Sequence, residues 1–374
     1  MKITDVTVTL FMWDGIPLTN YSAISGTLGI FGGKATMGLV TISTDEGVQG
    51  HSFLGTSSQG ADFDAQSLIT IMKPRLMGKD PLQREELWQS CDMGVRRSTI
   101  RVAGAVDVAL WDLAGKVAGL PIYKMLGGYR TSIPAYASSP VYQEVAPYVE
   151  EALKLKSEGW TAYKIHPPTR TDLDIEICRA VRKAVGDDYM LMLDSTWAYE
   201  FPEALKVGRA IEELNYYWYE DPLADDDIYN YVKLREKLDI PLLATEHSPG
   251  GFTAYAEWIT AKATHFLRGD VQVKGGITAV MKTAHLAEAF HMKYEVHHGG
   301  NSLNNVANLH TIMAMKNTTL FEVLLPDGAQ KFGLVKDIKP DKNGLVHIAP
   351  FDGPGLGAEI DFKLIESKKT AVLS

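Results

Sequence analysis

Ionisable side chains recur through the second half of the chain at nearly constant separations. Successive members lie 30, 26, 26, 24, 27 and 25 residues apart. They are Lys164, Asp194, Glu220, Glu246, Asp270, His297 and Glu322. A single Asp or Glu after an apolar run is usually a helix cap or a solvated charge. A set that keeps step with one structural period indicates instead that the side chains share one site.

Three of these residues, Asp194, Glu220 and Glu246, are consecutive carboxylates in the series. Carboxylate oxygens suit Mg²⁺, which binds a few carboxylates, retains water and leaves positions for a ligand. Zinc is less favoured because no His or Cys lies among the three. The sequence therefore predicts a hard-oxygen site with Mg²⁺ as cofactor.

The other members are groups that can carry protons. Lys164 and His166 are two residues apart on a predicted strand and share one face. His297 comes from a later strand, and Asp270 could accept from its ring and fix its tautomer. Glu322 could hydrogen-bond a substrate carboxylate oxygen if protonated, or act on the metal shell.

These residues close short β-rich runs that alternate with amphipathic helical stretches. The runs are 132–139, 161–166, 190–194, 216–221, 241–246, 265–271, 292–297 and 320–325. Eight such βα units predict a (β/α) barrel, in which catalytic groups gather at the carboxyl ends of the strands. The alternative is an open doubly wound sheet. It is less favoured because no Gly-rich phosphate loop follows the first strand.

The first part of the chain has a different pattern. Strands are predicted at 4–11 and 34–44, polar loops at 20–33 and 51–60, and helices from 61 to about 119, where Gly119 and Pro121 end the last one. We therefore expect an α+β capping domain over 1–128, a barrel domain over 129–326, and a C-terminal segment, 327–374, that returns to the cap.

Composition narrows the class of protein further. The chain of 374 residues has a formal net charge of -9, which argues against a nucleic-acid partner. No run approaches the roughly 18 apolar residues of a membrane span. The N-terminus alternates like a strand and lacks the features of a signal peptide. A cytoplasmic enzyme that acts on a small molecule is the expectation.

Four segments carry a resemblance to a known family. They are RVAGAVDVALWDLAGK (101–116), WYEDPL (218–223), the GD…KGG run (269–276) and PGLG (354–357). Together with the strand-end residues they resemble the mandelate racemase and muconate lactonising enzymes of the enolase superfamily, over nearly the whole chain. The resemblance implies an enolase-type barrel with a cap, and a homo-oligomer.

The resemblance also implies residue roles. Asp194, Glu220 and Glu246 would be the metal ligands, and Asp270 with His297 would be the catalytic dyad of the mandelate racemase branch. Glu322 would hydrogen-bond the enolate oxygen, and Lys164 would be the first Lys of a Lys-x-Lys motif. His166 stands where the family usually has the second Lys. His298 follows His297, and the strand register favours His297 over His298 as the member of the dyad.

The predicted reaction is removal of the proton α to a carboxylate. With a hydroxyl on the β carbon, loss of water yields an enol and then a 2-keto acid, which needs one good base and one acid. We therefore favour an acid-sugar dehydratase. A racemase or epimerase is the alternative; cycloisomerisation and a catalytically silent binding protein are less favoured.

The two polar loops would cover the barrel mouth and exclude water. The first carries Asn20, Tyr21, Ser22, Ser25 and Thr27; the second carries His51, Ser52, Thr56, Ser57, Ser58 and Gln59. Asn301, Ser302 and Asn304 follow the seventh strand. This polarity favours a polyhydroxylated acid. Neither loop has an evident Arg or Lys pair for a second carboxylate, which slightly favours an aldonate over an aldarate.

Overall fold

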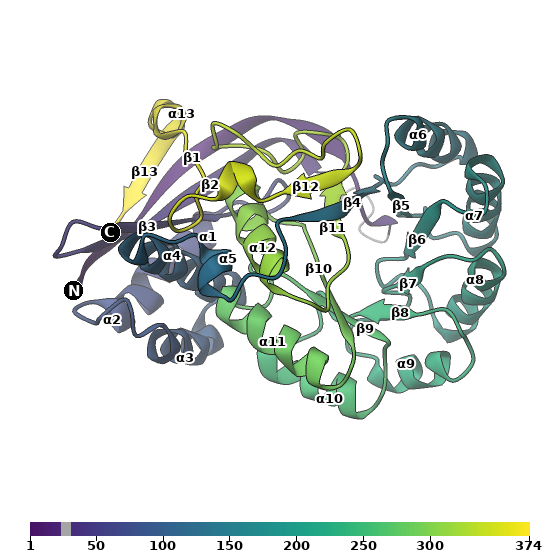
Figure 1. The fold of residues 1–374 in the computed structure, drawn as a ribbon, viewed down its shortest axis with the longest axis horizontal. Coiled ribbons are helices and arrows are strands. Elements are labelled where there is room, and N and C mark those ends of the chain that lie inside the picture. The colour runs from purple at the N-terminus through teal and green to yellow at the C-terminus, as the bar shows by residue number, and fades with distance from the viewer. Residues whose placement is uncertain (24–30) are drawn as a thin grey trace.

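The computed structural model describes residues 1–23 and 31–374. Its two main parts are a barrel of parallel strands and an antiparallel sheet packed beside it (Figure 1). Residues 24–30, with Ser25 and Thr27 of the first predicted loop, lie outside the described residues. Within the described part, no helix combines the length and apolar character that crossing a bilayer would require.

The predicted barrel is confirmed, and each of the eight predicted runs contains one strand. Neighbouring strands pair in parallel in the order β10-β9-β8-β7-β6-β5-β4-β11. Their bounds are β4 Ser132–Ser138, β5 Ala162–Ile165, β6 Met190–Asp194, β7 Trp218–Glu220, β8 Leu242–Ala244, β9 Phe266–Gly269, β10 Lys293–Val296 and β11 Phe321–Leu324.

Helices connect successive strands and cover the outside of the barrel (Figure 1). An apolar face toward the strands and a polar face toward solvent is what such a connection requires. Their bounds are α6 Val145–Ser157, α7 Thr171–Val185, α8 Phe201–Glu213, α9 Ile228–Arg235, α10 Tyr255–Thr260, α11 Ile277–Ala289 and α12 Ser302–Ala314.

An apolar layer fills the inside of the barrel. Its buried members, which come from five strands or the residue before one, are Tyr136, Ala162, Met192, Trp218, Leu243 and Leu320, and Phe266 packs against them. Because side chains alternate between the two faces of a strand, a residue two positions further on points inward as well. The next inward layer is therefore fixed by the position of this one.

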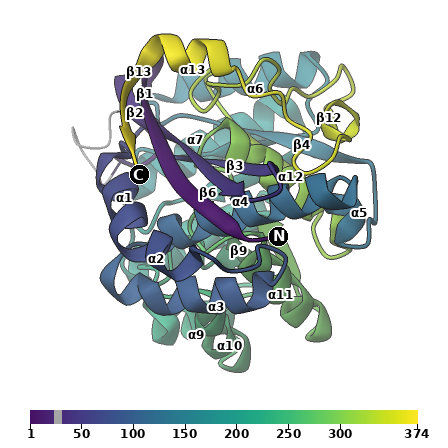
Figure 2. The same ribbon diagram turned by 90° about the vertical axis from the view of Figure 1, so that its left-hand side faces the viewer.

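The antiparallel sheet has the strand order β13-β1-β2-β3 (Figure 2). Its strands are β1 Ile3–Thr19, β2 Phe31–Thr44, β3 Gln49–Leu54 and β13 Lys369–Leu373. Helices follow in the same part of the chain: α1 Asp62–Ser67, a π-helical turn Leu68–Met72, α2 Lys73–Leu76, α3 Arg84–Gly94, a short 3-10 turn Val95–Arg97, α4 Ile100–Ala118 and α5 Ile122–Met125.

The strands of this sheet are longer than the sequence indicated. β1 runs to Thr19 rather than residue 11, because its pairing with β2 continues past irregularities at Asp14, Ile16 and Thr19 that interrupt the alternation of side chains. β3 includes residues 51–54, the first four of the second predicted loop, where His51 pairs with Thr41 of β2. The loops themselves are therefore shorter than 20–33 and 51–60.

The C-terminal segment touches both parts of the molecule. β12 (Leu345–His347) pairs with β4, and α13 (Phe362–Lys368) precedes β13, which pairs with β1. The PGLG turn lies against α4, where Asp112 accepts from the Leu356 amide at 2.9 Å and from the His51 amide at 2.8 Å. The limits 1–128, 129–326 and 327–374 stay a prediction.

Helix α4 of the cap packs directly against the barrel. Its C-terminus is formed by Gly119, with φ of 66°, as the sequence predicts. Asp107 accepts the Thr278 amide, at the start of α11, at 2.8 Å. Gly104 of α4 lies so close to the barrel that a Cβ there would come within 2.4 Å of the Val271 carbonyl oxygen.

This contact predicts the effect of Gly104→Ala. In an isolated helix the change would add about 1 kcal/mol of stability. Here we expect the free energy of unfolding to fall by about 1–3 kcal/mol, because the methyl group overpacks a backbone contact. Urea unfolding measures the difference, with Ala118→Gly in the exposed last turn as the control for helix propensity. A Gly104→Ala protein as stable as the wild type would contradict the prediction.

Candidate active site

A layer of charged side chains lies directly above the apolar layer of the barrel. Each of four candidate residues stands two positions after an apolar inward residue: Lys164 after Ala162, Asp194 after Met192, Glu220 after Trp218, and Glu322 after Leu320. All four are buried. Strand alternation therefore brings together side chains that lie up to 158 residues apart, counted from 164 to 322.

Lys164 is at the centre of this layer. Its Nζ lies 2.8 Å from Asp194 Oδ2, 3.0 Å from Glu220 Oε2 and 2.8 Å from Glu322 Oε1. Burial by itself lowers the pKa of Lys164, but the charges of these carboxylates outweigh it and raise the pKa well above its ordinary value. Lys164 is therefore an ammonium group shared by three carboxylates in the metal-free protein.

His166 is held at both ring nitrogens. Its Nδ1 lies 2.6 Å from the carbonyl oxygen of Ser139, and its Nε2 lies 3.0 Å from Asp194 Oδ2. A carbonyl oxygen only accepts, so Nδ1 carries a proton. The ring of Tyr21 packs edge-on against it, 5.8 Å away between centroids. The cavity therefore has a fixed imidazole where the resemblance leads us to expect a second Lys.

Arg268 is a member of the charged layer that the sequence reasoning missed. Its Nε lies 2.5 Å from Glu220 Oε1 and 3.0 Å from Glu246 Oε2, and its Nη2 lies 2.5 Å from Glu322 Oε2. Its side chain has no exposed area. Arg268 stands two positions after Phe266 and two before Asp270, so period-two alternation along β9 was the signal that could have found it.

Glu322 is ionised rather than protonated. Besides Lys164 and Arg268, the backbone amide of His298 donates to Glu322 Oε2 at 3.0 Å. Burial favours the neutral acid, but Arg268 and Lys164 outweigh it and place the pKa of Glu322 well below its ordinary value. Of the two roles that the sequence left open for Glu322, these contacts do not favour the protonated donor, since every close contact offers Glu322 a hydrogen to accept.

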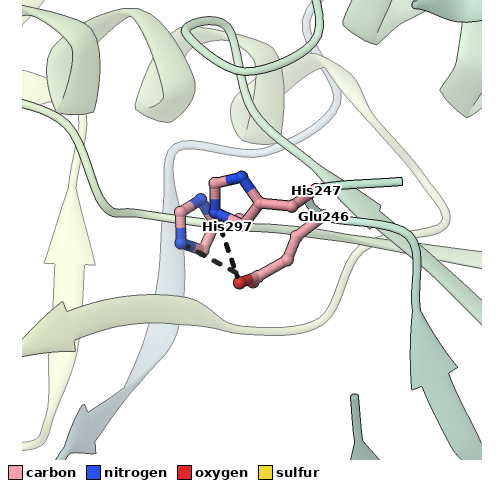
Figure 3. Close-up of side chains that lie close together, drawn as sticks. All are labelled: Glu246, His247 and His297. Atoms are coloured by element: carbon pink, nitrogen blue, oxygen red, sulfur yellow. Dashed lines mark ion pairs between the residues drawn. The ribbon is translucent and has the colours of Figure 1, made fainter. Parts of the chain in front are cut away.

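Glu246 enters the site through an irregular strand end. Thr245, just before it, has φ of 93°, a conformation that is strained for a β-branched residue. Glu246 Oε1 lies 3.7 Å from His247 Nε2, and Glu246 Oε2 lies 3.6 Å from His297 Nε2 (Figure 3). His247 is a second group that the sequence reasoning missed, because it looked like an ordinary residue after a strand.

His297 and Asp270 form a close pair. His297 Nδ1 lies 2.6 Å from Asp270 Oδ2, and the other carboxylate oxygen accepts the amides of Gln272 and Val273 at 2.7 Å. Burial lowers the pKa of His297, but Glu246 and Asp270 outweigh it and raise the pKa to about 9. His297 therefore faces Asp270 with one nitrogen and the cavity with the other.

His298 points away from this pair. Its ring is fully buried and packs on Phe321, with 4.1 Å between centroids. Burial lowers the pKa of His298 to about 3. Its neutral, enclosed ring is remote from substrate chemistry, as the strand register predicts for the neighbour of an inward residue.

The carboxylates fit a divalent cation. Burial and the charge of Asp194 raise the pKa of Glu220 to about 8, even though Arg268 opposes the rise. Burial also raises the pKa of Asp221 well above its ordinary value, and within residues 1–23 and 31–374 neither of its side-chain oxygens has a hydrogen-bond partner. Lys164 and Arg268 therefore do not supply enough positive charge to keep every carboxylate of this layer ionised. Carboxylate oxygens that need more positive charge are the donors a Mg²⁺ ion takes.

A cavity of about 670 Å³ opens above the charged layer. The cap contributes Tyr21, Ser22, Thr56, Ser57, Ser58 and Gln59 to its wall. Other predicted polar residues have structural roles: Ser52 donates to the Ala105 carbonyl at 2.6 Å, and Asn301 accepts the Asn304 amide at 3.0 Å as the cap of α12.

Two arginines also line the cavity from outside the two loops. Arg96 comes from the turn after α3, and Arg101 comes from α4, where its Nε lies 2.8 Å from Asp64 Oδ2. Asp92 lines the same cavity. The slight preference for an aldonate rested on the absence of such cations from the loops, so it loses its basis.

A parallel barrel with this charged layer and an Asp–His pair under an α+β cap defines a class of barrel enzyme. Two family models match the chain: the Enolase C-terminal domain-like model over 147–364, and the mandelate racemase / muconate lactonizing enzyme N-terminal domain over 29–127. The chain belongs to the mandelate racemase / muconate lactonizing enzyme family of the enolase superfamily.

Individual relatives agree with this assignment. The chain is 31% identical to arabinonate dehydratase of Saccharolobus solfataricus over 80% of this chain and 82% of that protein. It is 28% identical to D-galactarolactone cycloisomerase of Agrobacterium fabrum, over 86% and 88% of the two chains. A crystal structure described as D-glucarate dehydratase from Agrobacterium tumefaciens complexed with magnesium superposes with a TM-score of 0.88, at 34% identity, over 99% of this chain and 100% of that one.

The Asp270–His297 pair predicts a specific titration. In the metal-free protein we expect the pKa of His297 near the value of about 9, and a clearly lower pKa in Asp270→Asn, because the variant loses the charge that holds the imidazolium. NMR titration of the imidazole in EDTA measures both values. His265, whose pKa burial and Arg235 lower to about 4, serves as the internal control. Equal pKa values for His297 in the two proteins would contradict the assignment of Asp270.

Arg268 predicts a second result, in stability. Arg268→Gln leaves Glu220, Glu246 and Glu322 with one buried cation fewer, so the free energy of unfolding of the metal-free protein should fall by about 3–5 kcal/mol. Added Mg²⁺ should restore more stability to the variant than it adds to the wild type. Urea unfolding in EDTA and in Mg²⁺ measures this. Arg209→Gln, on the exposed face of α8, is the matched control, and an equal Mg²⁺ effect in all three proteins would count against the role of Arg268.

Proposed function

We propose that this enzyme removes the proton α to the carboxylate of a sugar acid, with Mg²⁺ as cofactor. Loss of the β-hydroxyl as water then gives a 2-keto-3-deoxy acid. The substrate is an aldonate or an aldarate. The observation that carries the proposal is the Asp270–His297 pair, joined at 2.6 Å at the edge of a cavity whose floor is a layer of carboxylates.

The names of the relatives support the reaction class. Arabinonate dehydratase and the crystal structure described as D-glucarate dehydratase are both named for dehydration of sugar acids, and the latter is described as complexed with magnesium. The match to the former spans four fifths of this chain, and the match to the latter spans nearly all of it. The polar side chains that the cap contributes to the cavity wall, such as Tyr21, Ser58 and Gln59, are compatible with a polyhydroxylated ligand.

The proposed metal ligands are Asp194, Glu220 and Glu246. A divalent cation held by them would supply Lewis-acid stabilisation of the negative charge that develops on the substrate carboxylate. Lys164 and Arg268 keep the three carboxylates close together in a buried layer. Glu322 contacts the same two cations from the opposite side of the barrel, and its ionised carboxylate holds Lys164 and Arg268 in position.

His297 is the proposed principal base and acid. The charge of Glu246 holds His297 as an imidazolium in the metal-free protein, and a cation bound to Glu246 would offset that charge and free the neutral ring. Its Nε2 then takes the α proton, and the electron pair of the broken C–H bond moves toward the substrate carboxylate. The same Nε2 then gives its proton to the β-hydroxyl, the C–O bond breaks, and water leaves with that electron pair. The resulting enol tautomerises to the 2-keto acid. Asp270 fixes the tautomer and stabilises the imidazolium in between.

His166 and Lys164 serve the opposite face of the substrate in this proposal. β5 and β10 are separated by four strands along the sheet, so the two sets of groups lie across the barrel mouth. His166 carries a proton on Nδ1, which is fixed on a backbone carbonyl, and presents Nε2 to the site. A homo-oligomeric state, expected from the resemblance, stays a prediction.

The test is a screen of purified protein with Mg²⁺ against aldonic and aldaric acids. We expect a 2-keto acid, detected with semicarbazide, and a product whose mass is lower by one water. His297→Asn should lower kcat by about 10²–10⁴-fold, which is the usual contribution of a positioned acid or base. Glu220→Gln should lose activity together with its response to Mg²⁺. His298→Asn is the control: it makes the same substitution at the neighbouring residue, which points away from the cavity, and it should retain most of the activity.

The other reactions of the family give different signals in the same screen. Exchange of the α proton with D₂O without keto acid would favour the racemase or epimerase. A product of unchanged mass from an added sugar-acid lactone would favour a cycloisomerase, the activity for which the D-galactarolactone relative is named. Neither keto acid nor exchange with any acid in the library would count against the proposed substrate class.

A further inference from the structure

Glu246, His247 and His297 form a cluster that the proposed reaction does not fully use. One ligand atom from each of the three side chains lies within 4.8 Å of the other two. Figure 3 shows the two imidazole rings and the carboxylate converging from the ends of β8 and β10. In contrast to the three carboxylates proposed for Mg²⁺, this group offers two nitrogens and one oxygen.

The separations fit a small coordination sphere. With ligand bonds of about 2.0–2.2 Å to zinc, adjacent donors of a tetrahedral site lie about 3.3–3.6 Å apart. The carboxylate of Glu246 lies 3.6 Å from His297 Nε2 and 3.7 Å from His247 Nε2. The third separation, between the ligand atoms of the two His residues, is within 4.8 Å, so a movement of the half-exposed ring of His247 toward His297 would complete the geometry.

The surroundings of the cluster also resemble those of a metal site. A metal-binding His commonly donates its second ring nitrogen to a carboxylate, which fixes the ring and raises its basicity. His297 has this arrangement, with Nδ1 2.6 Å from Asp270 Oδ2. Glu246 is held by Arg268, and the ring of His247 packs edge-on against Trp197, 5.2 Å away between centroids. All three donors line the cavity, so a fourth position would face its open space.

We propose that Glu246, His247 and His297 bind a borderline transition-metal ion of the Zn²⁺ class, at a site distinct from the Mg²⁺ site. The donor sets differ in kind, since imidazole nitrogen selects zinc, cobalt or nickel, while carboxylate oxygen alone suits magnesium. Glu246 is common to both sets. Zn²⁺ at this site occupies His297 Nε2, the atom that carries the proton in the proposed function, and therefore inhibits the enzyme.

Metal binding to the metal-free full-length protein tests the site without turnover. Zn²⁺ affinity is measured by competition with a chromophoric chelator, and Co²⁺ reports tetrahedral nitrogen ligation by its visible absorption. We expect His247→Asn to weaken Zn²⁺ binding at least tenfold and to remove the Co²⁺ band, with Mg²⁺ binding unchanged. Asp194→Asn, which removes a ligand of the oxygen site only, should weaken Mg²⁺ binding and keep the Co²⁺ band.

The matched control is His291→Asn, which removes an exposed His at the end of α11 and should change neither result. Zn²⁺ affinity that is the same in the wild type and in His247→Asn would overturn the proposal. So would a Co²⁺ spectrum of octahedral oxygen ligation that persists in His247→Asn and disappears in Asp194→Asn, because the ion would then be in the oxygen site.

Inhibition depends on the proposed function and is tested separately. With a substrate identified, Zn²⁺ should inhibit the Mg²⁺-loaded wild type at concentrations at least tenfold below those needed for His247→Asn. If His247→Asn loses Zn²⁺ binding but Zn²⁺ leaves wild-type turnover unchanged, the metal site stands and the role of His297 as the acid/base falls. If no sugar acid is turned over, the binding experiments still decide the site.

Discussion

The site depends on the balance of buried charge above the apolar layer of the barrel. Carboxylates from four strands meet two cations, Lys164 and Arg268, in a buried region at the base of the cavity. Desolvation of so many ionised groups is costly unless each is paired. The two cations reduce that cost in the metal-free protein but do not offset it fully, as the raised pKa values of Glu220 and Asp221 indicate, and a divalent ion would supply the positive charge that these carboxylates lack.

The rest of the fold keeps this layer in place and encloses it. Strand alternation fixes the charged layer by placing its residues two positions after those of the apolar layer. The cap packs close to the barrel through Gly104 and Asp107 of α4, which holds it beside the cavity. A buried, enclosed cavity strengthens the electrostatic interactions within it, which is the condition that removal of a weakly acidic proton requires.

Glu246 joins the three kinds of chemistry in this site. It faces Arg268 in the charged layer, belongs to the proposed Mg²⁺ ligands, and contributes with His247 and His297 to the proposed nitrogen-rich site. The strained φ of Thr245 aims it there, out of step with the alternation that places the other carboxylates. The proton chemistry of His297 and the binding of metal are therefore coupled through a single carboxylate.

The sequence by itself determined the periodic features. The number of strands, their positions, and the strand-end series from Lys164 to Glu322 follow from patterns that repeat along the chain, because alternation of side chains is a local property. Tertiary structure alone decided the partners: that Arg268 reaches three carboxylates, that Glu322 is ionised, that Arg96 and Arg101 reach the cavity, and that His247 turns toward His297. These contacts join side chains on different strands, and their distances depend on how the barrel closes, which no local pattern encodes. The ends of β1 and β3 were missed for the same reason, since pairing between strands extends them past breaks in the alternation.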